Sequence, residues 1–75
     1  MKPVASVQEA MNLVDSFAGS PSEFQLLIPD ELNDLVGWNM AFITDRILRR
    51  GWEPDGFAQE SGYRIYKYKE WEDAP

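Results

Sequence analysis

The chain has 75 residues, a net charge of −6 at pH 7 and a hydrophobic content of 44%, which predicts one small acidic domain over residues 1–75. It contains no cysteine and no histidine. These absences exclude disulfides, thiolate metal sites and the commonest general base in enzymes. We therefore expect no enzyme activity, no bound metal and no cofactor.

The first element predicted is a helix over residues 7–18. Ser6 and Glu9 have the spacing of a capping box, and apolar residues follow at helical intervals up to Ala18. Gly19 is the expected stop.

Residues 20–29 leave two alternatives open. Ser20 and Glu23 form a second capping-box pattern with Pro21 at the first helical position, which favours a short helix over 21–28. Pro29 disfavours helix at the residue before it, and residues 24–28 are nearly all apolar, as in a strand that is covered on both faces. We prefer the strand.

A long helix is predicted over residues 30–50. Its apolar positions recur at helical spacing, from Leu32 to Ile47. Acidic residues occupy the amino end and arginines the carboxyl end, the arrangement that the helix dipole favours, and Gly51 supplies the stop.

The rest of the chain predicts a hairpin. Residues 52–56 are expected to bend the chain, residues 57–59 to form a short strand, residues 60–62 a loop, and residues 63–69 the clearest strand. Residues 70–75 are expected to be a frayed acidic tail. The predicted fold is a small two-layer α+β sandwich of order α-β-α-β-β. Its long helix packs on a three-stranded sheet with a C-terminal hairpin, and β-α-β connects parallel neighbouring strands.

The negative charge is unevenly distributed. Residues 1–45 contain seven acidic residues and one base, Lys2, whereas residues 46–75 contain six of each. An anionic surface repels phosphate and attracts basic partners. We therefore expect a protein partner with a basic surface, which contacts an aromatic anchor among acids on the long helix. The candidate residues are Asp30, Glu31, Asp34, Trp38 and Asp45.

The final strand suggests an alternative, a nucleic-acid-associated regulator. Aromatic and basic residues alternate there, and such side chains can stack bases and hold phosphates. The candidates are Arg64, Tyr66, Lys67, Tyr68 and Lys69. Successive side chains of a strand point to opposite faces. One face therefore carries Tyr63, Ile65, Lys67 and Lys69, and the other carries Arg64, Tyr66, Tyr68 and Glu70. Because one face must be buried, direct nucleic-acid binding is the weaker hypothesis. The same strand is otherwise expected to be a half-buried edge strand.

The absence of long apolar runs and of a signal-peptide pattern predicts a protein without membrane contact, and the lack of cysteine fits the cytoplasm. Small acidic chains without cysteine are a format of phage and mobile-element antagonists, including anti-CRISPR proteins. By analogy with that format, the expected function is a protein-binding inhibitor of that type, acting on a nucleic-acid-binding complex. A homodimeric or homo-oligomeric assembly subunit is a further alternative.

Overall fold

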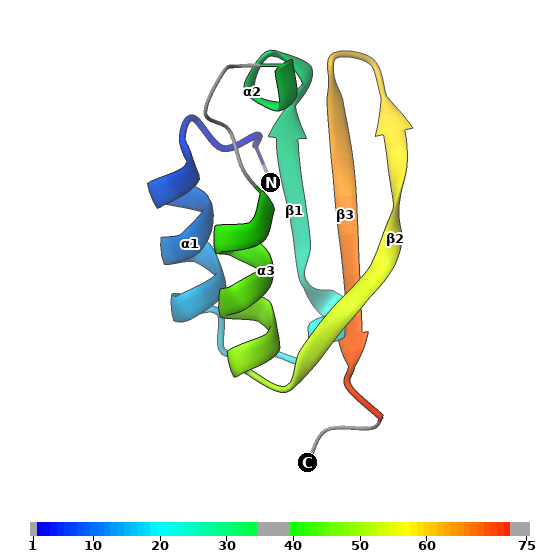
Figure 1. Cartoon of the computed structure of the whole chain (residues 1–75). Coiled ribbons are helices and arrows are strands. Elements are labelled where there is room, and N and C mark those ends of the chain that lie inside the picture. Colours follow the sequence, from blue (N-terminus) through cyan, green and yellow to red (C-terminus); the bar gives the residue numbers. More distant parts are fainter. Residues whose placement is uncertain (1, 35–39, 73–75) are drawn as a thin grey trace.

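The computed structural model describes residues 2–34 and 40–72 (Figure 1). The elements follow the predicted order α-β-α-β-β in a small compact α+β domain, which confirms the expected fold class. They are α1 (Val7–Ser16), the 3₁₀ turn η1 (Pro21–Glu23), β1 (Gln25–Pro29), α2 (Asp30–Asp34), α3 (Met40–Arg49), β2 (Trp52–Glu60) and β3 (Tyr63–Glu70).

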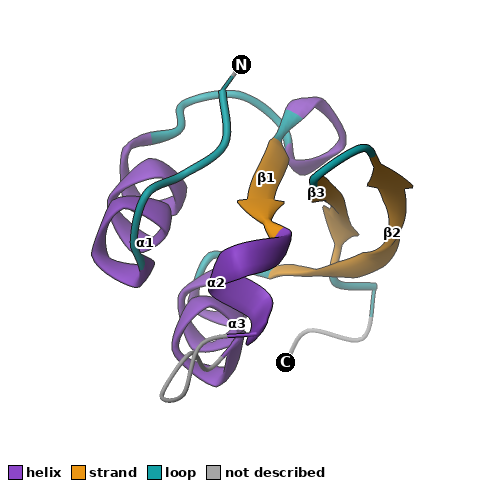
Figure 2. Cartoon of the chain, turned by 90° about the horizontal axis from the view of Figure 1, so that it is seen from above, coloured by secondary structure: helices purple, strands orange, loops and turns teal. Residues whose placement is uncertain are grey.

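The three strands form one antiparallel sheet in the order β1-β3-β2. The helices α1 and α3 lie on one side of it (Figure 2). Two expectations about the sheet are therefore wrong: β1 and β2 are not neighbours, and β3 is the central strand rather than an edge. Proline and a bulge suit an edge strand, and β2 contains both, whereas the β-branched and aromatic residues of β3 suit the centre.

Helix α1 begins as predicted. The Ser6 hydroxyl oxygen accepts from the Glu9 N–H at 3.1 Å, and the Glu9 carboxylate accepts from the Ala5 N–H at 3.3 Å. The helix ends at Ser16, two residues before the predicted end. Arg50 donates to the Val14 carbonyl and, at 2.6 Å, to the Phe17 carbonyl. Arg50, which follows the last residue of α3, therefore supplies hydrogen-bond donors to backbone carbonyls at the end of α1.

Residues 20–29 contain both of the structures that the sequence left open. Pro21–Glu23 form a single 3₁₀ turn, where the Ser20 N–H donates to the Glu23 carboxylate at 3.2 Å. The preferred strand follows at Gln25–Pro29, with Leu26, Leu27 and Ile28 all buried.

The predicted helix over residues 30–50 corresponds to α2 and α3. These two helices occupy the two ends of that range, and residues 35–39 lie outside the described residues. Helix α3 ends before Gly51, whose φ of 77° is the left-handed stop expected there.

The hairpin is longer than predicted. Residues 52–56, which were expected to form a bend, belong to β2, because a bulge between Pro54 and Phe57 accommodates them. Gly56 has a φ of 94°, which a residue with a side chain adopts only with strain. At the other end Glu70 pairs with Trp52, and the Trp71 N–H donates to the Gly51 carbonyl at 2.8 Å. The part of the predicted tail over residues 70–71 is therefore attached to the sheet.

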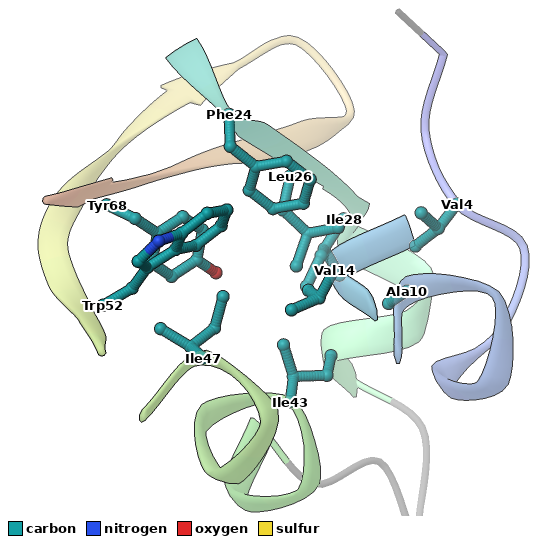
Figure 3. Packing of buried hydrophobic residues seen from close by; sticks show 10 residues of the cluster. All are labelled: Val4, Ala10, Val14, Phe24, Leu26, Ile28, Ile43, Ile47, Trp52 and Tyr68. Atoms are coloured by element: carbon teal, nitrogen blue, oxygen red, sulfur yellow. The ribbon is translucent and has the colours of Figure 1, made fainter. Parts of the chain in front are cut away.

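The core fills the space between the two helices and the sheet face that they cover (Figure 3). An aromatic group closes one end, with the Phe24 ring 5.6 Å from Trp52 and 5.7 Å from Tyr68 between centroids. None of the described helices has the length and apolar character needed to cross a membrane. The buried core residues are Val4, Ala10, Val14, Phe24, Leu26, Ile28, Ile43, Ile47, Trp52 and Tyr68.

Candidate functional site

One end of the sheet collects polar and aromatic side chains around an exposed phenylalanine. Figure 1 shows α2 at the same end of the sheet as the β2–β3 turn. The Asp30 N–H, at the start of α2, donates to the Gly62 carbonyl in that turn at 3.0 Å. This bond attaches the first acidic residue of α2 to the hairpin. We define the hairpin-end cluster as Asp30, Phe57, Gln59, Glu60 and Arg64.

Gln59 is the central polar residue of the cluster. Its side-chain nitrogen lies 3.3 Å from both carboxylate oxygens of Asp30 and 2.7 Å from the Glu60 carbonyl. Its side-chain oxygen accepts from Arg64 Nε at 3.2 Å. These contacts fix the carboxylate of Asp30 in α2 relative to the guanidinium of Arg64 in β3.

Phe57 is the exposed apolar member of the cluster, with 56% of its surface accessible. The Arg64 guanidinium carbon lies 5.1 Å from the centre of the ring, and the Tyr66 ring lies 5.6 Å away at 41°. Cation–π and tilted aromatic contacts of this kind restrict the ring. Phe57 is therefore both accessible and held in position, as a binding anchor requires.

The acidic residues predicted to bind a partner are only partly brought together. Asp30 belongs to the cluster, and Glu31 is exposed next to it on α2. Asp45 lies instead on α3, where it pairs with Arg49 at 3.0 Å. Trp38 and the side chain of Asp34 lie outside the described residues.

The residues of the nucleic-acid hypothesis are divided between two faces of β3, as the alternation predicted. Tyr68 is buried in the core at 4% exposure, so its ring is not available to stack a base. Tyr66 is partly buried against the same core and Arg64 lies over Phe57. Lys67 and Lys69 extend from the opposite face, where Lys69 pairs with Glu53 at 3.6 Å and lies 3.9 Å from Asp55.

Most cations have partners within the protein. Arg46 pairs with Asp15 at 3.6 Å, Arg50 donates to backbone carbonyls, and Arg64 donates to Gln59. Together with the pairs of Arg49 and Lys69, five of the seven basic residues are engaged. Within residues 2–34 and 40–72, only Lys2 and Lys67 have no such partner, so few cations are left for phosphates.

The fold strongly perturbs the titration of Tyr68. Its burial, and to a smaller extent the nearby charge of Tyr66, raises the pKa of the Tyr68 phenol above its ordinary value. The hydroxyl has no hydrogen-bond partner among the described residues, and Figure 3 shows it inside the core. Its place in the packed interior makes Tyr68 a structural residue.

The described part of the chain contains no cavity and no group of three acidic residues that could hold a metal ion. Comparisons with protein-family models, with curated proteins and with solved structures found no match to this chain.

Three members of the cluster were not identified from the sequence. Phe57, Gln59 and Glu60 belong to a stretch that was predicted only as a short strand and its loop. Their importance depends on the pairing of Gln59 with Arg64 and on the position of Asp30 beside the turn. The only local signal is the apolar Phe57 just after Gly56 in a run of turn-forming residues.

Proposed function

We propose that this protein is a non-enzymatic binding module whose hairpin-end cluster docks on a basic surface of a partner protein. The observation that carries the proposal is Phe57, which is 56% exposed yet restrained by Arg64 and Tyr66. Exposed aromatic side chains in fixed positions supply much of the energy of protein interfaces. The Asp30 carboxylate, which Gln59 holds on the same face of the sheet as Phe57, would select a basic partner and accelerate its association.

The charge distribution supports a protein partner over nucleic acid. The net charge is −6, and the basic residues are mostly engaged within the fold. Affinity for nucleic acid comes largely from free lysines and arginines that neutralise phosphates. A basic surface on the partner would itself be suited to nucleic acid, so we propose an antagonist that competes for such a surface, in the manner of phage or mobile-element inhibitors.

The chain offers a matched pair of variants that tests the docking surface. Phe57 on β2 and Phe42 on α3 are exposed to nearly the same extent, 56% and 59%. We expect Phe57→Ala to lose partner proteins captured from a cell lysate on the immobilised domain, and Phe42→Ala to retain them. Both substitutions remove exposed rings, so both variants should remain folded.

Charge reversal provides an independent comparison. Asp30→Lys should weaken capture, whereas Asp45→Lys on α3 should leave it unchanged. The opposite result would place the docking surface on α3. Competition by single-stranded RNA or DNA for the captured partner would support the antagonist role, because both ligands would use the same basic surface.

Two further measurements test the alternatives. A gel shift with single-stranded RNA and DNA at about 50 mM salt, where phosphate-driven affinity is strong, should show no complex. A shift that Lys67→Glu abolishes would instead support the nucleic-acid regulator. Light scattering after size exclusion should give the mass of the 8.6 kDa monomer, and a larger mass would support the assembly subunit.

A further inference from the structure

The sheet has one covered edge and one free edge. At the β1 edge, the Val4 N–H donates to the Leu27 carbonyl at 2.9 Å, so the amino-terminal segment satisfies part of that edge. At the other edge, β2 has no neighbouring strand beyond it in the described residues. Unpaired backbone groups on such an edge can accept an added strand.

The Val4 bond also establishes which groups of β2 face outward. Because the Leu27 carbonyl points away from β3, the pair Leu27–Ile65 does not exchange backbone hydrogen bonds. Backbone groups alternate along a strand, so those of Ile65 point toward Ala58 on β2. It follows that the N–H and C=O groups of Phe57 and Gln59 point to the free edge.

The two halves of β2 differ in how well this edge is protected. Residues 52–56 contain Pro54, Gly56 and the bulge, which prevent regular pairing on the outside. Residues 57–60 pair with residues 63–66 in unbroken register and contain no proline, glycine or bulge. Residues 57–60, the unprotected half, include the members of the hairpin-end cluster that belong to β2: Phe57, Gln59 and Glu60.

We propose, building on the proposed function, that the edge of residues 57–60 binds an extended segment of the partner protein by strand addition. Opposite residues on neighbouring strands place their side chains on the same face. An apolar side chain of the segment would pack beside Phe57, and a lysine or arginine two residues along would lie beside Gln59 and the Asp30 carboxylate.

A second copy of this chain fits the edge less well than a basic segment does. Strand β2 contains three acidic residues, Glu53, Asp55 and Glu60, and no basic residue. Lys69 of β3 pairs with Glu53 and Asp55, but Glu60 has no ion pair within the described residues. Pairing two copies of β2 would therefore bring two uncompensated Glu60 carboxylates to one interface. Charge complementarity therefore favours a basic segment of a partner protein as the strand that pairs with the β2 edge.

Two substitutions at Gln59 separate the backbone from the side chain. Gln59→Pro and Gln59→Ala both remove the contacts to Asp30 and Arg64, but only proline removes the outward N–H. Proline at an outward-facing edge position leaves the β2–β3 hydrogen bonds in place. Circular dichroism and the thermal midpoint of each variant would verify that both are folded.

The probe is the labelled peptide Thr-Val-Thr-Lys-Thr-Val-Thr-Lys, and the control is the same peptide with glutamate for lysine. Fluorescence anisotropy should show binding of the lysine peptide to the wild type and weaker but measurable binding to Gln59→Ala, which keeps the outward N–H but loses the contact that positions Asp30. The lysine peptide should bind Gln59→Pro about ten-fold or more weakly than it binds Gln59→Ala. The glutamate peptide should bind the wild type about ten-fold or more weakly than the lysine peptide does. In spectra of the ¹⁵N-labelled wild type, the amides of Phe57 and Gln59 should become protected from exchange on binding.

Three results would overturn strand addition. These are no binding at about 1 mM lysine peptide, equal binding by the proline and alanine variants, and protection on α3 instead of β2. Self-association that only Gln59→Pro abolishes would make the occupant a second copy. If Phe57→Ala loses the natural partner while Gln59→Pro retains it, the proposed function stands and strand addition fails.

Discussion

Arg50 should stabilise the fold far more than its neighbour Arg49. The Arg50 guanidinium donates to the carbonyls of Val14 and Phe17 at the end of α1 and lies 4.3 Å from the centre of the Trp52 ring. It therefore connects α1, the end of α3 and the start of β2. Arg49 forms an ion pair with Asp45 on the same helix, and its side chain is 68% exposed.

The expected magnitudes follow from these contacts. Charged hydrogen bonds contribute about 1.5–3 kcal/mol, a cation–π contact about 0.5–1 kcal/mol, and an exposed pair within a helix about 0.3–0.5 kcal/mol. Because the contacts of Arg50 share one side chain and are not additive, we expect Arg50→Ala to lower the free energy of unfolding by about 3 kcal/mol. Arg49→Ala should lower it by less than about 0.5 kcal/mol.

Urea unfolding followed by circular dichroism would measure both values. A domain of this size loses roughly 1 kcal/mol of stability per molar urea, so the midpoint of Arg50→Ala should fall by about 3 M. Arg50→Lys keeps the charge but not the two-armed donor, and should give an intermediate loss. Equal midpoints for Arg50→Ala and Arg49→Ala would refute the role of Arg50 as a connector.

Three other substitution and pH effects follow from the core and the bulge. Tyr68→Phe removes a buried hydroxyl that has no hydrogen-bond partner among residues 2–34 and 40–72, and it should raise the free energy of unfolding by about 1 kcal/mol, whereas Tyr63→Phe should leave it unchanged. A lower free energy of unfolding for Tyr68→Phe in urea would show that the hydroxyl is bonded. The pKa of Tyr68 is raised in the folded protein, so above pH ~10 the unfolded chain releases this proton first. The free energy of unfolding of the wild type should therefore fall there by up to about 1.4 kcal/mol per pH unit. Tyr68→Phe should lack this component of the pH dependence. Gly56→Ala meets no neighbouring atom but keeps a φ of 94°, and should cost about 1–2 kcal/mol in the same assay; an unchanged midpoint would mean that the bulge can adopt another backbone conformation.

Local signals were sufficient to predict most of the elements. The capping box of Ser6 and Glu9 marks the start of α1, and Pro29 marks the end of β1. The end of α1 was predicted two residues too late, because the cap comes from Arg50, which is 36 residues away from Val14 along the chain. A cap of this kind leaves no pattern near the helix that it ends.

The strand order and the candidate site depended on long-range choices. The sequence pattern predicts a hairpin, but it does not show that β1 pairs with β3 and leaves β2 at the edge. Asp30 and Gln59 are 29 residues apart and meet only because α2 lies beside the hairpin turn. Of the acidic residues predicted to bind a partner, Asp30 lies in the hairpin-end cluster, whereas its aromatic neighbour Phe57 was not identified from the sequence.

Hydrogen–deuterium exchange on a complex with a captured partner tests the central claim most directly, because it reports which surface the partner covers. We predict new protection over residues 57–60, where Phe57 and Gln59 present their backbone groups to the free edge. Exchange over α3, which carries Phe42 and Asp45, should stay unchanged. Protection of α3 with unchanged exchange over residues 57–60 would contradict the assignment of the hairpin end as the docking surface.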